Sequence, residues 1–124
     1  GRGMTSDRRR ADGARAVQLA AEHLESRGWT VLARNWRPKE GEIDLVARDG
    51  DCLVFVEVRS RGSRTRSGSP EESIGWAKRR RLRLLAERYL LAHPWPGPCR
   101  IDAVAVVLAA DGRAQRLDHY PNVA

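Results

Sequence analysis

Two strand-like runs joined by Asp49-Gly50 constrain the fold of this chain more than any other feature. The first run covers residues 41–46, the second covers residues 53–56, and both are largely apolar. Asp-Gly is a preferred pair for a two-residue β-hairpin turn, so the two runs are predicted to pair as antiparallel strands. The register predicted from this turn pairs Arg48 with Asp51, Glu42 with Glu57, and Asp44 with Phe55.

This register gives the hairpin one apolar core face and one mixed face, because side chains alternate between the two faces of a strand. The core face carries Ile43, Leu45, Ala47, Cys52, Val54, Val56 and Val58. The mixed face carries Glu42, Asp44, Val46, Arg48, Leu53, Phe55, Glu57 and Arg59. A slip of one residue would scramble the core and separate Asp44 from Glu57, so the apolar pattern favours the register that unites these acids.

Asp44 and Glu57 are unusual in strands, because strands disfavour Asp and a buried carboxylate must be paired or bound to metal. One interpretation is a divalent-metal site. Carboxylate oxygens suit Mg²⁺ or Mn²⁺, and Mg²⁺ takes only one or two protein carboxylates besides water and substrate phosphate. The other interpretation is an ion pair between Arg59 and either acid on an exposed sheet face. Taken on its own, the pattern favours the ion pair.

The rest of the chain predicts a single α/β domain over residues 11–124, preceded by a disordered basic arm over residues 1–10. The predicted elements are a helix that ends before Gly28, a strand over 29–36, the hairpin, a helix containing Leu82 and Tyr89, a buried strand over 101–108 and an edge strand over 115–120. The order α-β-β-β-α-β-β predicts a mixed β-sheet with flanking helices. The strands before and after the long helix are expected to be parallel.

A net charge of +7 and a pI near 10.6 indicate a polyanionic partner. Basic groups around an acidic site suit a nucleic acid, whose phosphates must approach the metal. The candidate nucleic-acid contacts are Arg61, Arg64, Arg66, Lys78, Arg79 and Arg80. The alternative is that these charges form a solvated face that keeps the protein soluble.

Composition argues against several other classes of protein. No apolar stretch approaches the ~20 residues needed to span a bilayer, and no secretory signal is recognisable. Cys52 and Cys99 lack zinc-ligand spacing and are typical of the reduced thiols of a cytoplasmic protein. The histidines lie far apart in the sequence, which gives a histidine-based hydrolase little support. We therefore expect a cytoplasmic protein that does not bind membranes.

Several stretches, in this order, resemble one family. They are residues 32–37, 41–45, 54–61, 77–82 and 100–104. The set resembles the YraN-like family of small bacterial proteins, within the PD-(D/E)xK restriction-endonuclease-like superfamily. The resemblance implies a restriction-endonuclease-like core and a site in which Asp44, Glu57 and the carbonyl of Val58 hold Mg²⁺ or Mn²⁺. It also implies that Arg59 stands at the place of the signature lysine.

The sequence departs from the family pattern at two places. One is Arg59, and the other is Ala16-Val17 in the first helix, where relatives often carry a glycine followed by a glutamate. A guanidinium keeps the positive charge but does not deprotonate, so Arg59 is able to position a water or clamp a phosphate and is unable to act as a base. Lys78 either supplies the missing amine or is a helix-surface charge. Glu42 is either a supporting acid beside the ligands or an exposed edge residue.

The function expected from these observations is nucleic-acid binding, with metal-dependent endonuclease activity on phosphodiesters in DNA, including structured or branched DNA. The main alternative is a catalytically impaired nucleic-acid-binding module that kept the nuclease fold. A weaker alternative is a basic protein–protein adaptor in which the acids form only an ion-pair site. DNA is the favoured nucleic acid, although no feature of the sequence distinguishes DNA from RNA, and a homodimer is compatible with the sequence.

Overall fold

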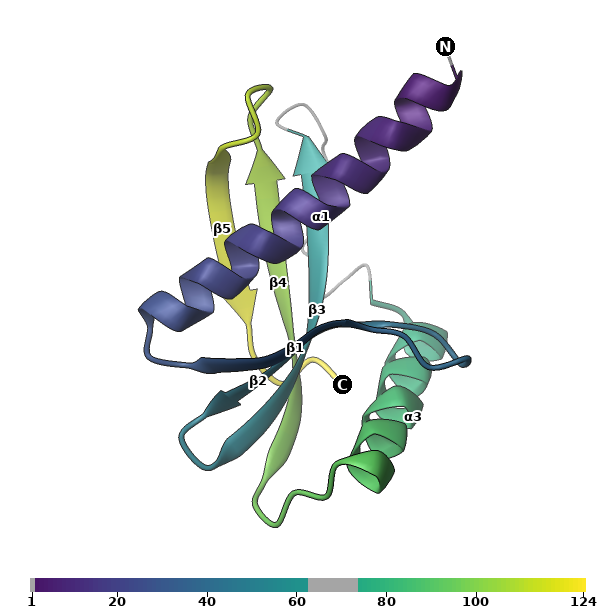
Figure 1. Cartoon of the computed structure of the whole chain (residues 1–124), viewed down its shortest axis with the longest axis vertical. Helices are drawn as coiled ribbons and strands as arrows, with labels where there is room; N and C mark the ends of the chain where they lie inside the picture. The colour runs from purple at the N-terminus through teal and green to yellow at the C-terminus, as the bar shows by residue number, and fades with distance from the viewer. Residues whose placement is uncertain (1, 63–73) are drawn as a thin grey trace.

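The computed structural model describes residues 2–62 and 74–124, with the side chains described for residues 10–61 and 74–124. The predicted nucleic-acid contacts Arg64 and Arg66 lie outside the described residues. In chain order the elements are α1 (Arg2–Ser26), β1 (Thr30–Trp36), β2 (Ile43–Asp49), β3 (Cys52–Gly62), α3 (Trp76–Ala92), β4 (Cys99–Leu108) and β5 (Ala114–Tyr120) (Figure 1). The predicted α/β class and the order α-β-β-β-α-β-β are confirmed.

The described strands form one mixed sheet in the order β1-β2-β3-β4-β5. Strands β3 and β4 are parallel, and every other neighbouring pair is antiparallel. The parallel pair is the one that the α3 connection joins, as a β-α-β crossover requires. The predicted mixed sheet with flanking helices is therefore confirmed.

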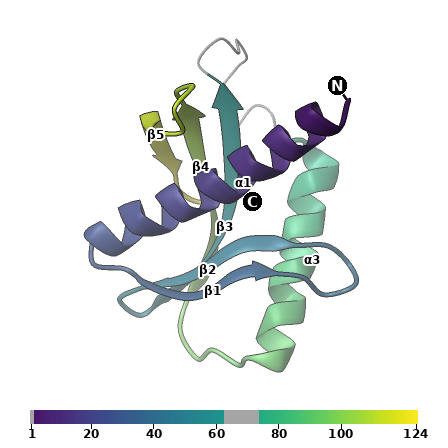
Figure 2. The same cartoon turned by 45° about the horizontal axis from the view of Figure 1, so that its top comes forward.

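Of the described helices, α1 covers one face of the sheet and α3 covers the other. Figures 1 and 2 show α1 running diagonally across the strands, with α3 lying along the sheet on the other side. The α1 face buries Leu45, Val54 and Val56, whereas the α3 face buries Val46, Leu53 and Phe55. This alternation along β2 and β3 is the one that the sequence predicts. Ile43 is an exception, because it begins β2 opposite Trp36 and packs on the α3 side instead of beside Leu45.

The hairpin turn consists of Gly50 and Asp51, because Asp49 pairs with Cys52. The predicted turn, Asp49-Gly50, was therefore wrong. Gly50 has a φ of +61°, and a turn with a positive φ at its first central residue alone is the type II′ turn, which favours glycine at that position. The predicted turn would have placed Asp49 there instead. In the observed register each β2 residue faces a partner two residues further along β3 than predicted, which preserves the alternation of faces.

Helix α1 begins at Arg2 and not after residue 10. Residues 2–10, for which the sequence predicts a disordered arm, thus form its first turns. No proline interrupts the helix, and extending an existing helix adds a backbone hydrogen bond per residue without a second nucleation step. The buried stripe of α1 includes Val17, Ala20, Ala21 and Leu24. No helix in the described part of the chain is long and apolar enough to cross a membrane.

Candidate active site

Asp44 and Glu57 lie side by side on β2 and β3, at the end of the hairpin away from its turn. Leu45 pairs with Val56, so the next residues outward along the two strands face each other. Both acids line one pocket of about 200 Å³ between the sheet and α3. The pocket is lined by Gly41, Glu42, Asp44, Glu57, Lys78, Arg81, Leu82 and Leu85. Carboxylates from two strands and cations from a helix are thus brought together.

Asp44 is held in place by the backbone of β3. The amide N–H of Val58 donates a hydrogen bond to Asp44 Oδ2 at 2.7 Å. Burial, followed by the negative charge of Glu57, raises the pKa of Asp44 from 3.8 to about 7, although the hydrogen bond from Val58 acts in the opposite direction. A carboxyl that is so reluctant to ionise marks a place where additional positive charge would be stabilising.

Glu57 is buried and faces cations from two elements. Its Oε1 atom lies 2.8 Å from Lys78 Nζ on α3 and 3.8 Å from an Arg59 guanidinium nitrogen on β3. Its side chain is 9% exposed, so the ion pair with Lys78 is largely withdrawn from water on the glutamate side. A carboxylate at this depth requires such partners. The pair with Arg59 predicted from the sequence is present, but Lys78 makes the shorter contact.

Lys78 belongs to the site because of its position on α3. It stands four residues before Leu82 and seven before Leu85, so the helical period places it on the inward stripe. The sequence alone is compatible with a Lys78 that points at the acids and with one that lies on the helix surface. The structure places it in the pocket, and the spacing to Leu82 and Leu85 was the signal that could have decided the question.

Glu42 lines the pocket from the loop before β2 and pairs with Arg37 at 3.0 Å. It does not lie opposite Glu57 as predicted, because Asp44 holds that position in the observed register. Its charge still contributes to raising the pKa of Asp44, after burial and Glu57. Glu42 is thus both a half-exposed edge residue and an electrostatic neighbour of the pocket.

The predicted basic residues are distributed unevenly around the pocket. Arg79 and Arg80 are exposed on α3, whereas Arg61 is partly buried on β3. Arg81, which the sequence analysis did not single out, lines the acid pocket. Its position depends on how α3 lies over the loop at Gly41. A Cβ added to Gly41 would lie 3.8 Å from Arg81 Cδ. No pattern in the sequence specifies that approach.

Asp102 is fully buried in a separate polar cluster on the α1 face, where it lies beside Val56. It accepts hydrogen bonds from Arg100 Nε at 2.9 Å and the backbone N–H of Asn122 at 2.9 Å, and His119 Nε2 lies 2.7 Å from its Oδ2. Burial alone would raise the pKa of Asp102, but the contacts with His119, Arg100 and Asn122 outweigh it and lower the pKa. The cluster joins β4 to β5 and takes no part in the acid pocket.

The fold and the pocket together define the class to which the chain belongs: a small α/β domain with a carboxylate pair and an ion-paired lysine between its mixed sheet and α3. The sequence matches "Uncharacterised protein family UPF0102" over residues 17–106. This chain therefore belongs to the UPF0102 family, the YraN-like family that its motifs resemble.

Proteins from several bacteria share the similarity along most of their length. A UPF0102 protein of Pelotomaculum thermopropionicum is 44% identical over 118 residues, which are 94% of this chain and 98% of that protein. A UPF0102 protein of an Arthrobacter species is 47% identical over 113 residues, 90% of this chain and 93% of that protein. One of Anaeromyxobacter dehalogenans is 45% identical over 122 residues, 98% of this chain and 89% of that protein.

Proposed function

We propose that this protein is a divalent-metal-dependent nuclease that hydrolyses phosphodiester bonds in DNA. The observation that carries the proposal is the convergence of Asp44 and Glu57 in one pocket with Lys78, whose Nζ lies 2.8 Å from Glu57. Paired acids on neighbouring strands and an amine on the facing helix are groups able to hold a metal and an attacking water beside a phosphate. The excess of positive charge on the chain suits a nucleic acid as the substrate.

The donor groups of the pocket fit Mg²⁺ or Mn²⁺. Asp44, Glu57 and the carbonyl of Val58 would hold the ion, and all three offer hard oxygen atoms. Among the described residues no group of three or more His, Cys, Asp or Glu side chains gathers to hold a metal. Two carboxylates are nevertheless sufficient for Mg²⁺, which keeps several waters and binds substrate phosphate. A metal bound there would act as a Lewis acid that lowers the pKa of a bound water and offsets negative charge on the phosphate.

Lys78 and Arg59 have different tasks in this proposal. The ammonium of Lys78 is a compact point charge that would orient the attacking water and offset negative charge on the phosphate. Arg59 stays charged, and its planar guanidinium fits two phosphate oxygens. The lysine of α3 would thereby place an amine beside Glu57, which Arg59 on β3 does not supply.

The second candidate is a nucleic-acid-binding module that has lost cleavage. Arg59 favours it, because the guanidinium two residues beyond Glu57 on β3 does not deprotonate and so cannot act as a base. The ion pair between Lys78 and Glu57 supports the first candidate, since it retains an amine at the acids. The two candidates predict the same binding and differ only in turnover.

The test is a cleavage assay on single-stranded, duplex and branched DNA with Mg²⁺, with Mn²⁺ and with EDTA. Wild type should cut at least one substrate only when metal is present. Glu57→Gln should abolish cleavage, and Lys78→Ala should lower it by about 10²-fold, a usual loss for one charge-stabilising or proton-transferring group. Glu22→Gln, an exposed acid on α1, is the matched control and should cut like wild type.

Two results would decide against cleavage. If wild type cuts no substrate with either metal while it binds DNA, the nuclease proposal fails and the binding module stands. If activity survives Glu57→Gln at the wild-type level, the cleavage comes from a contaminating enzyme or from another site, and the acid pocket is not responsible.

A further inference from the structure

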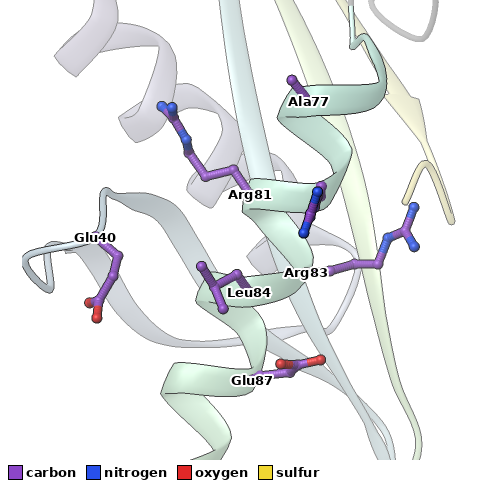
Figure 3. Close-up of a pocket in the computed structure, with 7 residues that line it drawn as sticks. Glu40, Ala77, Arg81, Arg83, Leu84 and Glu87 are labelled. Atoms are coloured by element: carbon purple, nitrogen blue, oxygen red, sulfur yellow. The ribbon is translucent and has the colours of Figure 1, made fainter.

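A second and larger hollow adjoins the acid pocket on the outer side of α3. It has a volume of about 640 Å³ (Figure 3). Its lining consists of Glu40, Ala77, Arg80, Arg81, Arg83, Leu84 and Glu87. We call it the α3 groove. Arg81 lines both the groove and the acid pocket, so the two hollows meet at this side chain. A chain of nucleotides with one phosphate at the acids would therefore continue past Arg81 into the α3 groove.

An exposed tryptophan stands beside this groove. Trp76 begins α3 and has 71% of its surface exposed, which is unusual for so large an apolar side chain. The guanidinium carbon of Arg80 lies 5.4 Å from the centre of the Trp76 ring, in a cation–π contact one helical turn away. Because Arg80 also lines the α3 groove, the indole is held at its edge. Exposed aromatic rings beside cations are the platforms on which unpaired bases stack.

The acids of the α3 groove indicate that more than phosphates is bound there. Glu40 and Glu87 also line the groove, and carboxylates repel the phosphates of single and double strands alike. Glu40 Oε2 is 3.4 Å from Arg88, but its Oε1 is buried without a hydrogen-bond partner among the described residues. A buried acceptor of this kind is costly unless a ligand supplies a donor. Unpaired bases expose their whole Watson–Crick edges, whose amino groups donate hydrogen bonds to carboxylates, whereas in a duplex these edges are taken up by base pairing.

We infer that the α3 groove binds unpaired nucleotides adjacent to the scissile phosphate, with a base stacked on Trp76 and phosphates near Arg80, Arg81 and Arg83. The substrate class is then a nucleic acid with a single-stranded segment. This inference rests on the proposed function, because it assumes that the polyanion at the acid pocket is a nucleic acid.

The inference is tested by equilibrium binding in EDTA at low salt. The probes are a single-stranded oligonucleotide, the same sequence as a blunt duplex, and a duplex with a single-stranded tail. Wild type should bind the two probes that contain unpaired bases more tightly than the blunt duplex. Trp76→Ala should weaken binding to these two probes by about 5- to 100-fold and leave the blunt duplex nearly unchanged, since stacking acts on accessible bases. Trp76→Phe keeps an aromatic face and should retain most of the preference.

The matched control is Leu91→Ala. Leu91 is another strongly exposed apolar residue of α3, with 79% of its surface accessible. It should bind like wild type. Equal binding of Trp76→Ala and wild type to every probe would overturn the inference while leaving the nuclease proposal intact. Competition by polyglutamate as effective as that by single-stranded DNA would also overturn it, because the groove would then serve an acidic protein. No binding of wild type to any nucleic acid removes both the proposed function and this inference.

Discussion

Replacing Asp44 with asparagine is expected to stabilise the protein at pH 8 and to have little effect near pH 4. Burial and the charge of Glu57 raise the pKa of Asp44 from 3.8 to about 7. Between these values the folded protein keeps a proton that the unfolded chain has released, so the free energy of unfolding falls as the pH rises. The interval corresponds to at most about 4 kcal/mol at 1.36 kcal/mol per pKa unit. Asparagine carries no charge, and its amide oxygen can still accept the hydrogen bond of Val58.

The measurement is urea unfolding in EDTA, followed by tryptophan fluorescence, for wild type and Asp44→Asn at several pH values from 4 to 8. The difference between the two free energies of unfolding should grow with pH and level off above about pH 7, by up to about 4 kcal/mol in favour of Asp44→Asn. Asp51→Asn, an exposed acid in the hairpin turn, should show no such trend. A pH-independent difference, or a less stable Asp44→Asn at pH 8, would refute the account of Asp44 as a destabilising buried carboxylate.

Three further outcomes are expected. Mg²⁺ at 100 times its dissociation constant should raise the free energy of unfolding of wild type by about 2.7 kcal/mol, measured by thermal or urea unfolding. The gain for Asp44→Asn should be clearly smaller. Equal gains would mean that the ion binds elsewhere. Arg59→Lys should preserve or raise the rate of DNA cleavage, whereas Arg59→Ala should lower it, because a compact ammonium keeps the charge beside Glu57; unchanged activity in Arg59→Ala would remove this residue from the site. Reversing the charges of Arg79 and Arg80 to glutamate should weaken DNA binding with little loss of stability and reduce the slope of log K against log salt by about 2, and an unchanged slope would mean that these exposed arginines do not reach phosphates.

In the hairpin, the alternation of apolar and polar residues specifies the faces of the strands but not their register. The pattern of apolar and polar residues assigned the acids of β2 and β3 to one face, and Asp44 and Glu57 do line one pocket. Alternation has a period of two residues, so it does not distinguish registers that differ by two. The register depends on which turn position Gly50 occupies. Asp49-Gly50 and Gly50-Asp51 both match the residue preferences of two-residue hairpin turns.

The helices show a different limit. The buried residues of α3 are Leu82, Leu85, Ala86 and Tyr89, and the same helical period extends back to Lys78. The helical period alone therefore could have identified Lys78 as inward-facing. It could not have shown that Lys78 meets Glu57, because that contact depends on where α3 crosses the sheet. The position of Arg81 and the shape of the α3 groove depend on the same crossing. They also depend on the loop at Glu40, which is distant from α3 in the sequence.

The sheet separates the core layer under α1 from the residues proposed to act on the substrate. Helix α1 packs fully buried alanines against one face, while the charges of the pocket lie on the other. Substitutions that share no partners usually have additive effects on stability. Mutations in the α1 layer are therefore free to compensate for an unfavourable carboxylate at Asp44 without altering the pocket. During evolution or engineering, the two sides of the sheet are able to change independently, so the charge pattern around Glu57 is open to revision while the fold is kept.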